Sequence, residues 1–374
     1  MKLSQEEEVL YWKFKDLKSG MGTHAPSVYS LLNEFPEVRI NIDACFLCNP
    51  YAFDLFNSYL KREDLENYLK FYPPQNKEIA ANISKYNKVP LDNILVGNGA
   101  IEIIESLFKY FSNQKVLIPI PTFSTYYEAA NKRNSVVYFE LLKEDGFEFN
   151  IEKLVESVLI EKPKIVAIVN PNNPTGSYIK SDDICKLHKA LSEDQLLIID
   201  ESFIDFHFDC KSIEEYAVNN QNIIVIRSLS KDFGVAGVRV GYAVLSKKLR
   251  AELLKDGFLW NSNGIAYLFS LFLANPEFQN EYQIAKAKYN NAKITFKREL
   301  DKLAGVRIYS SFTNFFLIEL NYDPYIFFTK LLFQFGIYTR VLDDRIGLKG
   351  NFIRLASKNS AENSEILFAI KNIK

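Results

Sequence analysis

The sequence predicts an α/β protein with a large, doubly wound, mostly parallel sheet domain and a smaller α+β domain. From about residue 94, short Ile/Val/Leu runs alternate with amphipathic helical patterns, which is typical of parallel strands covered on both faces. After about residue 265, the pattern changes to long helices followed by a few strands. We therefore expect an N-terminal segment (1–50) that contributes to the small domain, a large domain (51–265) and a C-terminal small domain (266–374).

The individual elements follow from these runs. Continuous apolar runs predict buried strands, and the stretches between them carry the three-to-four-residue spacing of helices. Ligands in such sheets bind at the carboxyl ends of the strands. The expected strands are NILVG (93–97), KVLIPIP (115–121), SVVYFEL (135–141), KIVAIVN (164–170), QLLIID (195–200), NIIVIR (222–227), NFFLIEL (314–320) and NFIRLAS (351–357); the expected helices lie at 100–111, 123–133, 151–162, 181–191 and 278–304.

The composition argues against several kinds of partner. Forty-five basic and 46 acidic side chains leave a net charge of -1, so no overall field attracts nucleic acid or an anionic membrane. The N-terminal stretch MKLSQEEEVLYWKFK is acidic and polar, unlike a signal peptide, and no run approaches the roughly 18 apolar residues of a membrane span. We expect a cytoplasmic protein that binds neither nucleic acid nor membrane.

The cysteines predict no metal site. Cys45 and Cys48 form a C-x-x-C pair, but no second pair or nearby histidine completes a zinc site, and Cys185 and Cys210 lie far away in the sequence. We therefore interpret Cys45 and Cys48 as small buried thiols of an apolar strand.

Polar residues gather where the predicted strands end. VGNGAIEII (96–104) places glycines before a helix whose first N–H groups could hold a phosphate. LLIIDES (196–202) ends a strand in two carboxylates, which are costly to bury without a cationic partner. RSLSKDFGVAGVRVGY (227–242) places Lys231 among serines, eight residues before Arg239. A lysine that can form a Schiff base, an acid for a pyridine nitrogen and an anion cradle are what pyridoxal phosphate requires.

These motifs carry a family resemblance. NPTG (173–176), then Asp200, then SLSK (228–231) with Arg239 resemble, in order and spacing, the pyridoxal-phosphate enzymes of the aspartate-aminotransferase fold (fold type I), class I and II. The resemblance covers essentially the whole chain. It implies pyridoxal 5'-phosphate as the cofactor.

The resemblance also implies roles for the residues around the cofactor ring. Lys231 would form the Schiff base with the aldehyde and then act as general acid and base at the substrate α-carbon. Asp200 would pair with the ring nitrogen, and Asn173 would donate to the ring hydroxyl. Phe123, in PTFSTY, matches the aromatic residue that stacks on the ring face.

The same resemblance implies a phosphate cradle and a dimer. Tyr72, in FYPPQN, matches a tyrosine that reaches the cofactor phosphate of the neighbouring subunit, which implies a homodimer with shared active sites. Within one subunit the phosphate would be held by the amides of Gly99 and Ala100 and by Ser228, Ser230 and Arg239.

Within the family, the chain is most similar to histidinol-phosphate aminotransferases and threonine-phosphate decarboxylases. The aminotransferases usually read D-E-x-Y where this chain has DESF, and Phe203 in place of the tyrosine favours the decarboxylases. His24, in GTHAPSVY, can be aligned with the decarboxylase histidine that approaches the substrate phosphate, although its flanking residues differ. An asparagine usual in the family is Leu47 here, which puts the local anion contacts in doubt.

Further substrate contacts are implied by the same two relatives. Arg354, in NFIRLAS, matches the arginine that clamps a substrate carboxylate or other anion, and Arg340 matches a second substrate-binding arginine. WNSN (260–263) resembles the decarboxylase W-S-V-N, with Asn263 facing the site, but the aminotransferases carry a similar sequence.

The expected function is decarboxylation of a small phosphorylated amino acid, O-phospho-L-threonine or O-phospho-L-serine, to a phosphorylated amino alcohol and carbon dioxide. One methyl group separates the two substrates, a difference worth only about 1–3 kcal/mol in a pocket. The alternative is a histidinol-phosphate-type aminotransferase that uses a 2-oxo acid. A protein that only senses pyridoxal phosphate, or a scaffold, is the non-enzyme alternative.

Overall fold

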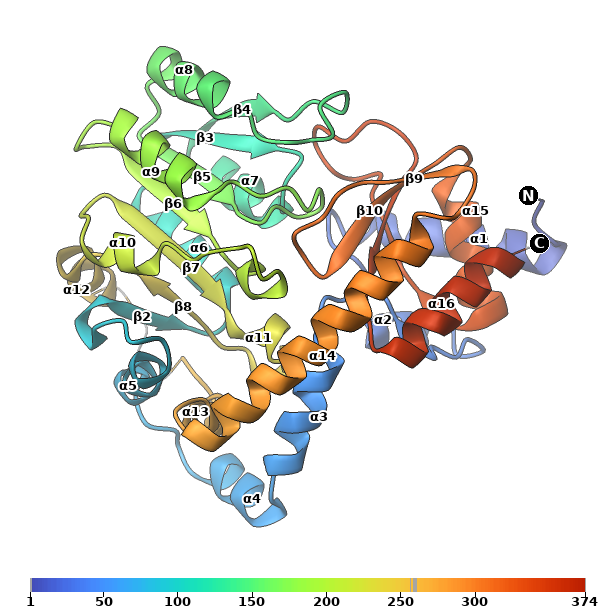
Figure 1. Cartoon of the computed structure of the whole chain (residues 1–374), viewed down its shortest axis with the longest axis horizontal. Helices are drawn as coiled ribbons and strands as arrows, with labels where there is room; N and C mark the ends of the chain where they lie inside the picture. The colour runs from blue at the N-terminus through green and yellow to red at the C-terminus, as the bar shows by residue number, and fades with distance from the viewer. Residues whose placement is uncertain (1, 256, 258–260, 374) are drawn as a thin grey trace.

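The computed structural model describes residues 2–255, 257 and 261–373. A seven-stranded sheet forms the large body, in the order β2-β8-β7-β6-β5-β3-β4 (Figure 1). Strands β4, β3, β5, β6 and β7 are parallel, and β8 runs antiparallel to both β7 and β2. The predicted large, mostly parallel sheet is confirmed, whereas the antiparallel β8 was not predicted. The strands are β2 (Ile94–Gly97), β3 (Lys115–Ile120), β4 (Ser135–Glu140), β5 (Ile165–Val169), β6 (Leu196–Asp200), β7 (Ile223–Ser228) and β8 (Gly241–Val244).

Helices cover both faces of this sheet. In β5, Ile165 and Ala167 pack into one core, whereas Val166 and Ile168 pack into another, because successive side chains of a strand point to opposite faces. A strand buried on both faces has no polar side, which explains the continuous apolar runs in the sequence. Helices α8 (Ile151–Glu161), α9 (Ser181–Ala190) and α10 (Glu214–Val218) lie on one face, and α6 (Ala100–Tyr110), α7 (Ser124–Asn131) and α12 (Lys247–Lys255) lie on the other (Figure 1).

A second body combines the two ends of the chain. Its antiparallel sheet has the order β12-β13-β10-β9, and a parallel pair, β1 with β11, ties the N-terminal segment to it. One apolar core contains side chains from both ends of the chain, including Phe14 and Leu31 with Phe328 and Ile353. The elements are α1 (Gln5–Ser19), α2 (Val28–Glu34), β1 (Ile42–Asp43), β9 (Val306–Ile308), β10 (Phe315–Leu320), α15 (Pro324–Phe335), β11 (Ile337–Tyr338), β12 (Arg340–Val341), β13 (Phe352–Ala356) and α16 (Ser360–Asn372).

The long helix α14 (Pro276–Leu300) connects the two bodies, and Figure 1 shows it running diagonally between them. Its first half contributes Phe278 and Tyr282 to the core of the large sheet, and its second half contributes Phe296 and Leu300 to the other core. Helix α13 (Gly264–Leu273) also packs on the large sheet. The division of the chain into domains at residues 50 and 265 stays a prediction. The separate apolar cores of the two bodies are consistent with it.

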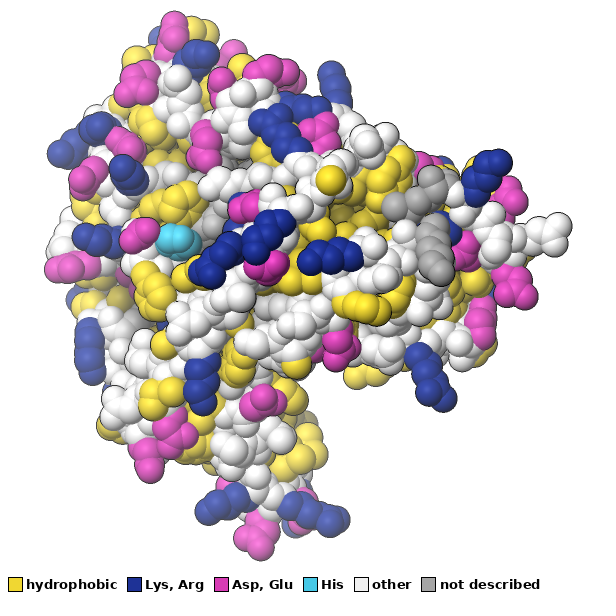
Figure 2. Space-filling view, turned by 45° about the vertical axis from the view of Figure 1, so that its right-hand side comes forward, with side chains coloured by type: hydrophobic (Ala, Val, Ile, Leu, Met, Phe, Trp, Pro, Cys, Tyr) yellow, Lys and Arg dark blue, Asp and Glu magenta, His cyan; other side chains and the backbone are white. Residues whose placement is uncertain are grey.

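Helices α3 (Pro50–Tyr59), α4 (Arg62–Lys70) and α5 (Asn76–Asn87) follow the N-terminal segment. α4 has no buried residue, and it lies at the tip of a lobe that projects from the body (Figures 1 and 2). Among the described residues, no helix combines the length and the apolar character that a membrane crossing requires.

The expected apolar strand around the C-x-x-C pair is wrong. β1 ends at Asp43, because the Asp43 carboxylate accepts the backbone N–H groups of Cys45 (3.0 Å) and Phe46 (2.9 Å) and so turns the chain. Cys45 is fully buried, whereas Cys48 lies at the wall of a cavity. All four cysteines are free thiols.

Candidate active site

One cavity brings together most of the residues predicted from the motifs. It lies where β5, β6 and β7 end, between the large sheet and the second body, and has a volume of about 280 Å³. Residues from as far apart as 24 and 354 contribute to its wall. The predicted residues that line it are His24, Ala100, Phe123, Asn173, Asp200, Ser228, Ser230, Lys231, Arg239, Arg340 and Arg354.

Lys231 lies in a short helix, α11 (Leu229–Asp232), that begins directly after β7. Its ammonium group is 4.3 Å from the centre of the buried Phe203 ring. Burial lowers the pKa of Lys231, and the nearby Asp200 carboxylate partly opposes this shift. A lowered pKa favours the neutral amine, which is the form that attacks an aldehyde.

Asp200 is the last residue of β6 and is 3% exposed. One carboxylate oxygen accepts the backbone N–H of Ser202 (2.8 Å), and the other accepts the hydroxyl of Tyr126 (2.9 Å). These two donors stabilise a buried carboxylate, which would otherwise be costly to remove from water. The arrangement suits an acid that pairs with a protonated ring nitrogen.

The start of α6 and the Arg239 side chain form a close-fitting cradle. Gly99, which caps α6, has φ +78°, and a Cβ at this position would lie 2.6 Å from the Arg239 guanidinium. A Cβ on Gly241 would lie 2.6 Å from the backbone nitrogen of Ala100. Arg239 itself has φ 57°, a left-handed conformation that is rare for residues other than glycine and clusters at functional sites. Helix N–H groups and a guanidinium that approach this closely fit the phosphate of pyridoxal phosphate.

Arg354 joins the two bodies at the cavity wall. Its guanidinium donates to Oδ1 of Asn173 (2.8 Å) and to the carbonyl of Cys45 (2.8 Å). Because Asn173 accepts through Oδ1, its Nδ2 group remains as a donor for a ligand. Nε of Arg354 is buried with no hydrogen-bond partner among the described residues, and burial lowers the pKa of Arg354 to about 10. An orphaned cationic donor of this kind indicates a site for an anion.

Arg340 and His24 contribute from the second body and the N-terminal segment. Arg340 is 3% exposed, donates to the carbonyl of Thr23 (2.8 Å) and forms an ion pair with Asp344. His24 is exposed and lies 3.3 Å from the Glu128 carboxylate. Phe123, at the start of α7, is half-buried, and its ring centre is 6.4 Å from that of His24.

Three predicted residues lie outside the cavity wall. Gly99 lies behind it, against Arg239. Asn263 caps α13: its Oδ1 accepts the N–H of Ala266 (2.8 Å), and its Nδ2 donates to the carbonyl of Val238 (2.9 Å). Tyr72 is 88% exposed, between α4 and α5. Trp260, in the same motif as Asn263, lies outside the described residues.

Sequence reasoning missed several residues of the site. The Tyr126 hydroxyl donates a hydrogen bond to the Asp200 carboxylate. Tyr126 lies three residues, about one helical turn, after Phe123, and this spacing could have predicted its place at the site. Arg345 lines the cavity five residues after Arg340, and no motif marks it. Leu47, flagged as a departure from the family, also lines the cavity.

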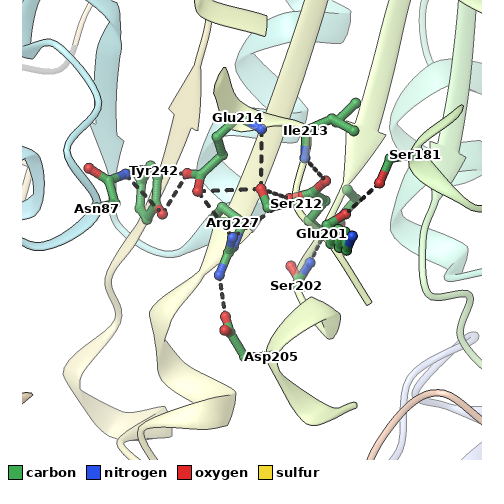
Figure 3. A network of polar contacts seen from close by, with 12 residues as sticks. Asn87, Ser181, Glu201, Ser202, Asp205, Ser212, Ile213, Glu214, Arg227 and Tyr242 are labelled. Carbon is green, nitrogen blue, oxygen red and sulfur yellow. Dashed lines mark hydrogen bonds and ion pairs between the residues drawn. The ribbon is translucent and has the colours of Figure 1, made fainter. Parts of the chain in front are cut away.

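A buried polar network supports the site from the other face of the sheet (Figure 3). Arg227, next to Ser228, forms ion pairs with Glu201 (3.6 Å), Glu214 (3.2 Å) and Asp205. Glu201 is fully buried and also accepts the backbone N–H of Ile213 (2.9 Å); burial raises its pKa to about 7. Arg227 is therefore the cationic partner that buried carboxylates at this strand end require.

The fold and the cavity define a pyridoxal-phosphate-dependent enzyme, and comparisons with known proteins identify the family. Residues 49–369 match the model of the class I and II aminotransferases. The chain is 40% identical over its whole length, and over 99% of the relative, to an L-serine phosphate decarboxylase of Campylobacter jejuni. It is 31% identical, over 82% of the chain and 85% of the relative, to a histidinol-phosphate aminotransferase of Caldanaerobacter subterraneus. The solved structure of a decarboxylase from Sulfurospirillum multivorans matches with a TM-score of 0.89 at 35% identity, covering 98% of each chain.

The chain belongs to the class I and II aminotransferase family. The predictions of this family, of its fold and of pyridoxal phosphate as the cofactor are confirmed. The roles of the individual site residues stay predictions.

Replacing Lys231 by Ala should abolish the Schiff-base absorption band of the protein after it is loaded with pyridoxal phosphate and the free cofactor is removed, because no other described residue of the cavity offers an amine to the aldehyde. The measurement is the absorption spectrum, with covalent trapping by borohydride as a second readout. Lys293→Ala is the control, because Lys293 is buried and donates to the carbonyl of Phe206. A coloured Lys231→Ala protein that traps the cofactor would contradict the assignment.

Gly99→Ala should weaken pyridoxal phosphate binding by about tenfold or more, because the new methyl group displaces Arg239 and the backbone at φ 78°, ψ 165°, which is essentially restricted to glycine, costs about 1–3 kcal/mol for alanine. Gly146→Ala is the matched control, since Gly146 has φ +68° but no atom within 4 Å of the added Cβ. The measurement is equilibrium titration of the apoprotein. Equal affinity in both variants would mean that Gly99 does not shape the cradle.

Arg227→Met should destabilise the fold by about 3–5 kcal/mol, because it leaves buried carboxylates without their cation. Urea denaturation measures the loss. Arg62→Met, which removes an exposed pair with Glu66, should change the midpoint little. A midpoint unchanged in Arg227→Met would show that the network adds nothing to stability.

Proposed function

We propose that the protein decarboxylates O-phospho-L-serine to carbon dioxide and phosphoethanolamine. The observation that carries the proposal is the surplus of buried cations on the substrate side of the cavity. Arg340 and Arg354 are directly opposite each other in the antiparallel pair of β12 and β13. Like charges in such a pair repel. A substrate with both a carboxylate and a phosphate would offset this repulsion.

The relatives support the same reaction. The C. jejuni protein is named an L-serine phosphate decarboxylase, and its likeness extends over this whole chain. The histidinol-phosphate aminotransferase of C. subterraneus is more distant, at 31% identity over a smaller share. O-phosphothreonine remains the second substrate to test, because a pocket separates it from O-phosphoserine by only about 1–3 kcal/mol.

The chemistry that bound pyridoxal phosphate supplies is the withdrawal of electrons from the α-carbon of an attached amino acid. Asp200, held by Tyr126 and Ser202, would keep a proton on the ring nitrogen and so strengthen that withdrawal. Arg354 would orient the substrate, and its hydrogen bond to Asn173, the expected donor to the ring hydroxyl, would fix the substrate relative to the cofactor ring. These groups do not themselves break a bond.

Lys231 would perform the proton step. The bond between the α-carbon and the carboxylate breaks, carbon dioxide leaves, and the electron pair stays behind. Lys231 would take a proton from the ammonium group of the incoming amino acid and later deliver it to the α-carbon, not to the cofactor, so the nitrogen would remain on the product. The arginines that would hold the carboxylate and the phosphate would set which bond at the α-carbon is positioned to break, and so would decide between decarboxylation and transamination.

The identity of residue 203, a phenylalanine, favours decarboxylation over transamination. Its ring, 2% exposed, packs edge-on to Phe315 (5.2 Å) and lies 4.3 Å from the Lys231 ammonium, so residue 203 itself offers Lys231 no hydroxyl. The resemblance places a tyrosine at this position in the aminotransferases.

We also propose a homodimer in which Tyr72 serves the partner's cavity. α4 has no buried residue in the single chain; Leu69 within it and Phe71 and Tyr72 just after it are exposed. Clustered exposed apolar side chains mark a surface that another protein covers. A second copy would bury them and bring Tyr72 to a phosphate.

The experiment is incubation of the holoenzyme with O-phosphoserine in the absence of any 2-oxo acid. We expect one molecule of phosphoethanolamine for each molecule of carbon dioxide released. We also expect kcat/KM to be lower for O-phosphothreonine than for O-phosphoserine. Headspace carbon dioxide and phosphorus NMR measure the two products.

The control reaction contains histidinol phosphate and 2-oxoglutarate. Formation of glutamate there, with no carbon dioxide from either phosphorylated amino acid, would replace the proposal by the aminotransferase alternative. A coloured protein that is inactive in both reactions would favour a sensor or scaffold.

A further inference from the structure

We propose that Arg345 is a specificity-determining residue that forms, together with Arg340, a two-armed subsite for the phosphomonoester of the substrate. The inference rests on the proposed function, because it names how that substrate is distinguished from an unphosphorylated amino acid.

The position of Arg345 is the first argument. It lies in the loop after β12, is 7% exposed, and lines the same cavity as Arg340 and Lys231. Its Nη1 donates to the carbonyl of Thr23 (2.7 Å), and Nη2 of Arg340 donates to the same carbonyl (2.8 Å). One backbone oxygen thus fixes two guanidinium groups next to each other at the cavity wall.

The charge around this pair is the second argument. Asp344 forms ion pairs with Arg340, with Arg345 (3.6 Å) and with Lys18 (3.7 Å). Lys18 is also paired with Asp343, whose side chain is 44% exposed and therefore well solvated. Three buried cations thus face two carboxylates, of which only Asp344 is close to Arg340 and Arg345, so these two guanidinium groups share one counter-charge. Buried charge of one sign is costly unless a counter-charge is present.

The chemistry of the ligand follows from this surplus. A guanidinium has five N–H donors in a planar fork, and the Thr23 carbonyl and Asp344 use only some of those on each arginine. A phosphomonoester presents three oxygens and close to two negative charges, which match two adjacent forks. A carboxylate presents two oxygens and one charge, which one fork satisfies. The second fork, Arg345, is therefore the part that selects phosphate.

Arg345 has a competing role that an experiment must separate. By holding the Thr23 carbonyl, it could act only as an anchor for the N-terminal segment, next to His24. Arg345→Gln distinguishes the two roles, because glutamine keeps an N–H donor for the carbonyl but carries no charge. Arg345→Lys keeps the charge but loses the planar fork.

The test measures binding of phosphoethanolamine and of L-serine to the pyridoxal-phosphate-loaded protein by calorimetry, together with kcat and KM for O-phosphoserine. In Arg345→Gln we expect phosphoethanolamine affinity to fall by about tenfold or more, with a matching rise in KM, a kcat within about threefold, and unchanged L-serine affinity. Arg345→Lys should recover only part of the loss. Arg250→Gln is the matched control, because Arg250 also donates to a backbone carbonyl, that of Ile94 (2.7 Å), away from this cavity.

Two results would overturn the proposal. One is an Arg345→Gln variant that binds phosphoethanolamine as tightly as the wild type. The other is an equal loss of phosphoethanolamine, L-serine and cofactor binding, which would show an anchor only. If the wild type releases no carbon dioxide but Arg345→Gln still loses phosphoethanolamine selectively, the proposed reaction fails and the phosphate subsite stands.

Discussion

The pairing of β6 with β7 is the constraint on which the rest of the site depends. Asp200 is the register partner of Ile226, so the side chains of Asp200 and Ile226 share one face of the sheet. The next residues, Glu201 and Arg227, point to the opposite face and pair there. The same two strand ends therefore place Asp200, the acid expected to pair with the cofactor ring, on one side and a buried ion pair on the other. A shift of one residue between these strands would exchange the two sets.

Several parts of the site could be predicted from the sequence because they depend on local chain geometry. Some local patterns indicate a binding site from the sequence alone. They include carboxylates at the end of a strand, a lysine after a strand and a glycine before a helix. The motif places Arg239 eight residues after Lys231. In the structure, Arg239 has a left-handed backbone conformation and its guanidinium packs against Gly99. The long apolar runs likewise predict strands buried on both faces, and the structure has them.

Other parts depend on contacts between distant segments, and the sequence carries no local signal for them. Arg345 is one of many arginines until the fold brings it to the carbonyl of Thr23. The strand expected at the C-x-x-C pair is absent because one side chain, Asp43, captures the next backbone N–H groups. Asn263, read as a substrate contact, caps a helix in the structure, which is an ordinary role for asparagine. In each case a polar side chain forms a hydrogen bond that the pattern of apolar residues does not predict.

The placement of the cations divides the work of the cavity between the two bodies. Arg239 and Lys231 belong to the large body, where we expect them to hold the cofactor, whereas Arg340, Arg345 and Arg354 come from the C-terminal body, where we propose that they bind the substrate. The hydrogen bond from Arg354 to Asn173 (2.8 Å) ties the C-terminal cations to the large body. Because Arg340, Arg345 and Arg354 lie in the same body and repel one another, an anionic ligand bound among them would relieve that repulsion, which a neutral ligand would not. In the proposed reaction the groups that neutralise the substrate would also fix the orientation of its carboxylate, so recognition of charge and choice of the bond that breaks would depend on the same contacts.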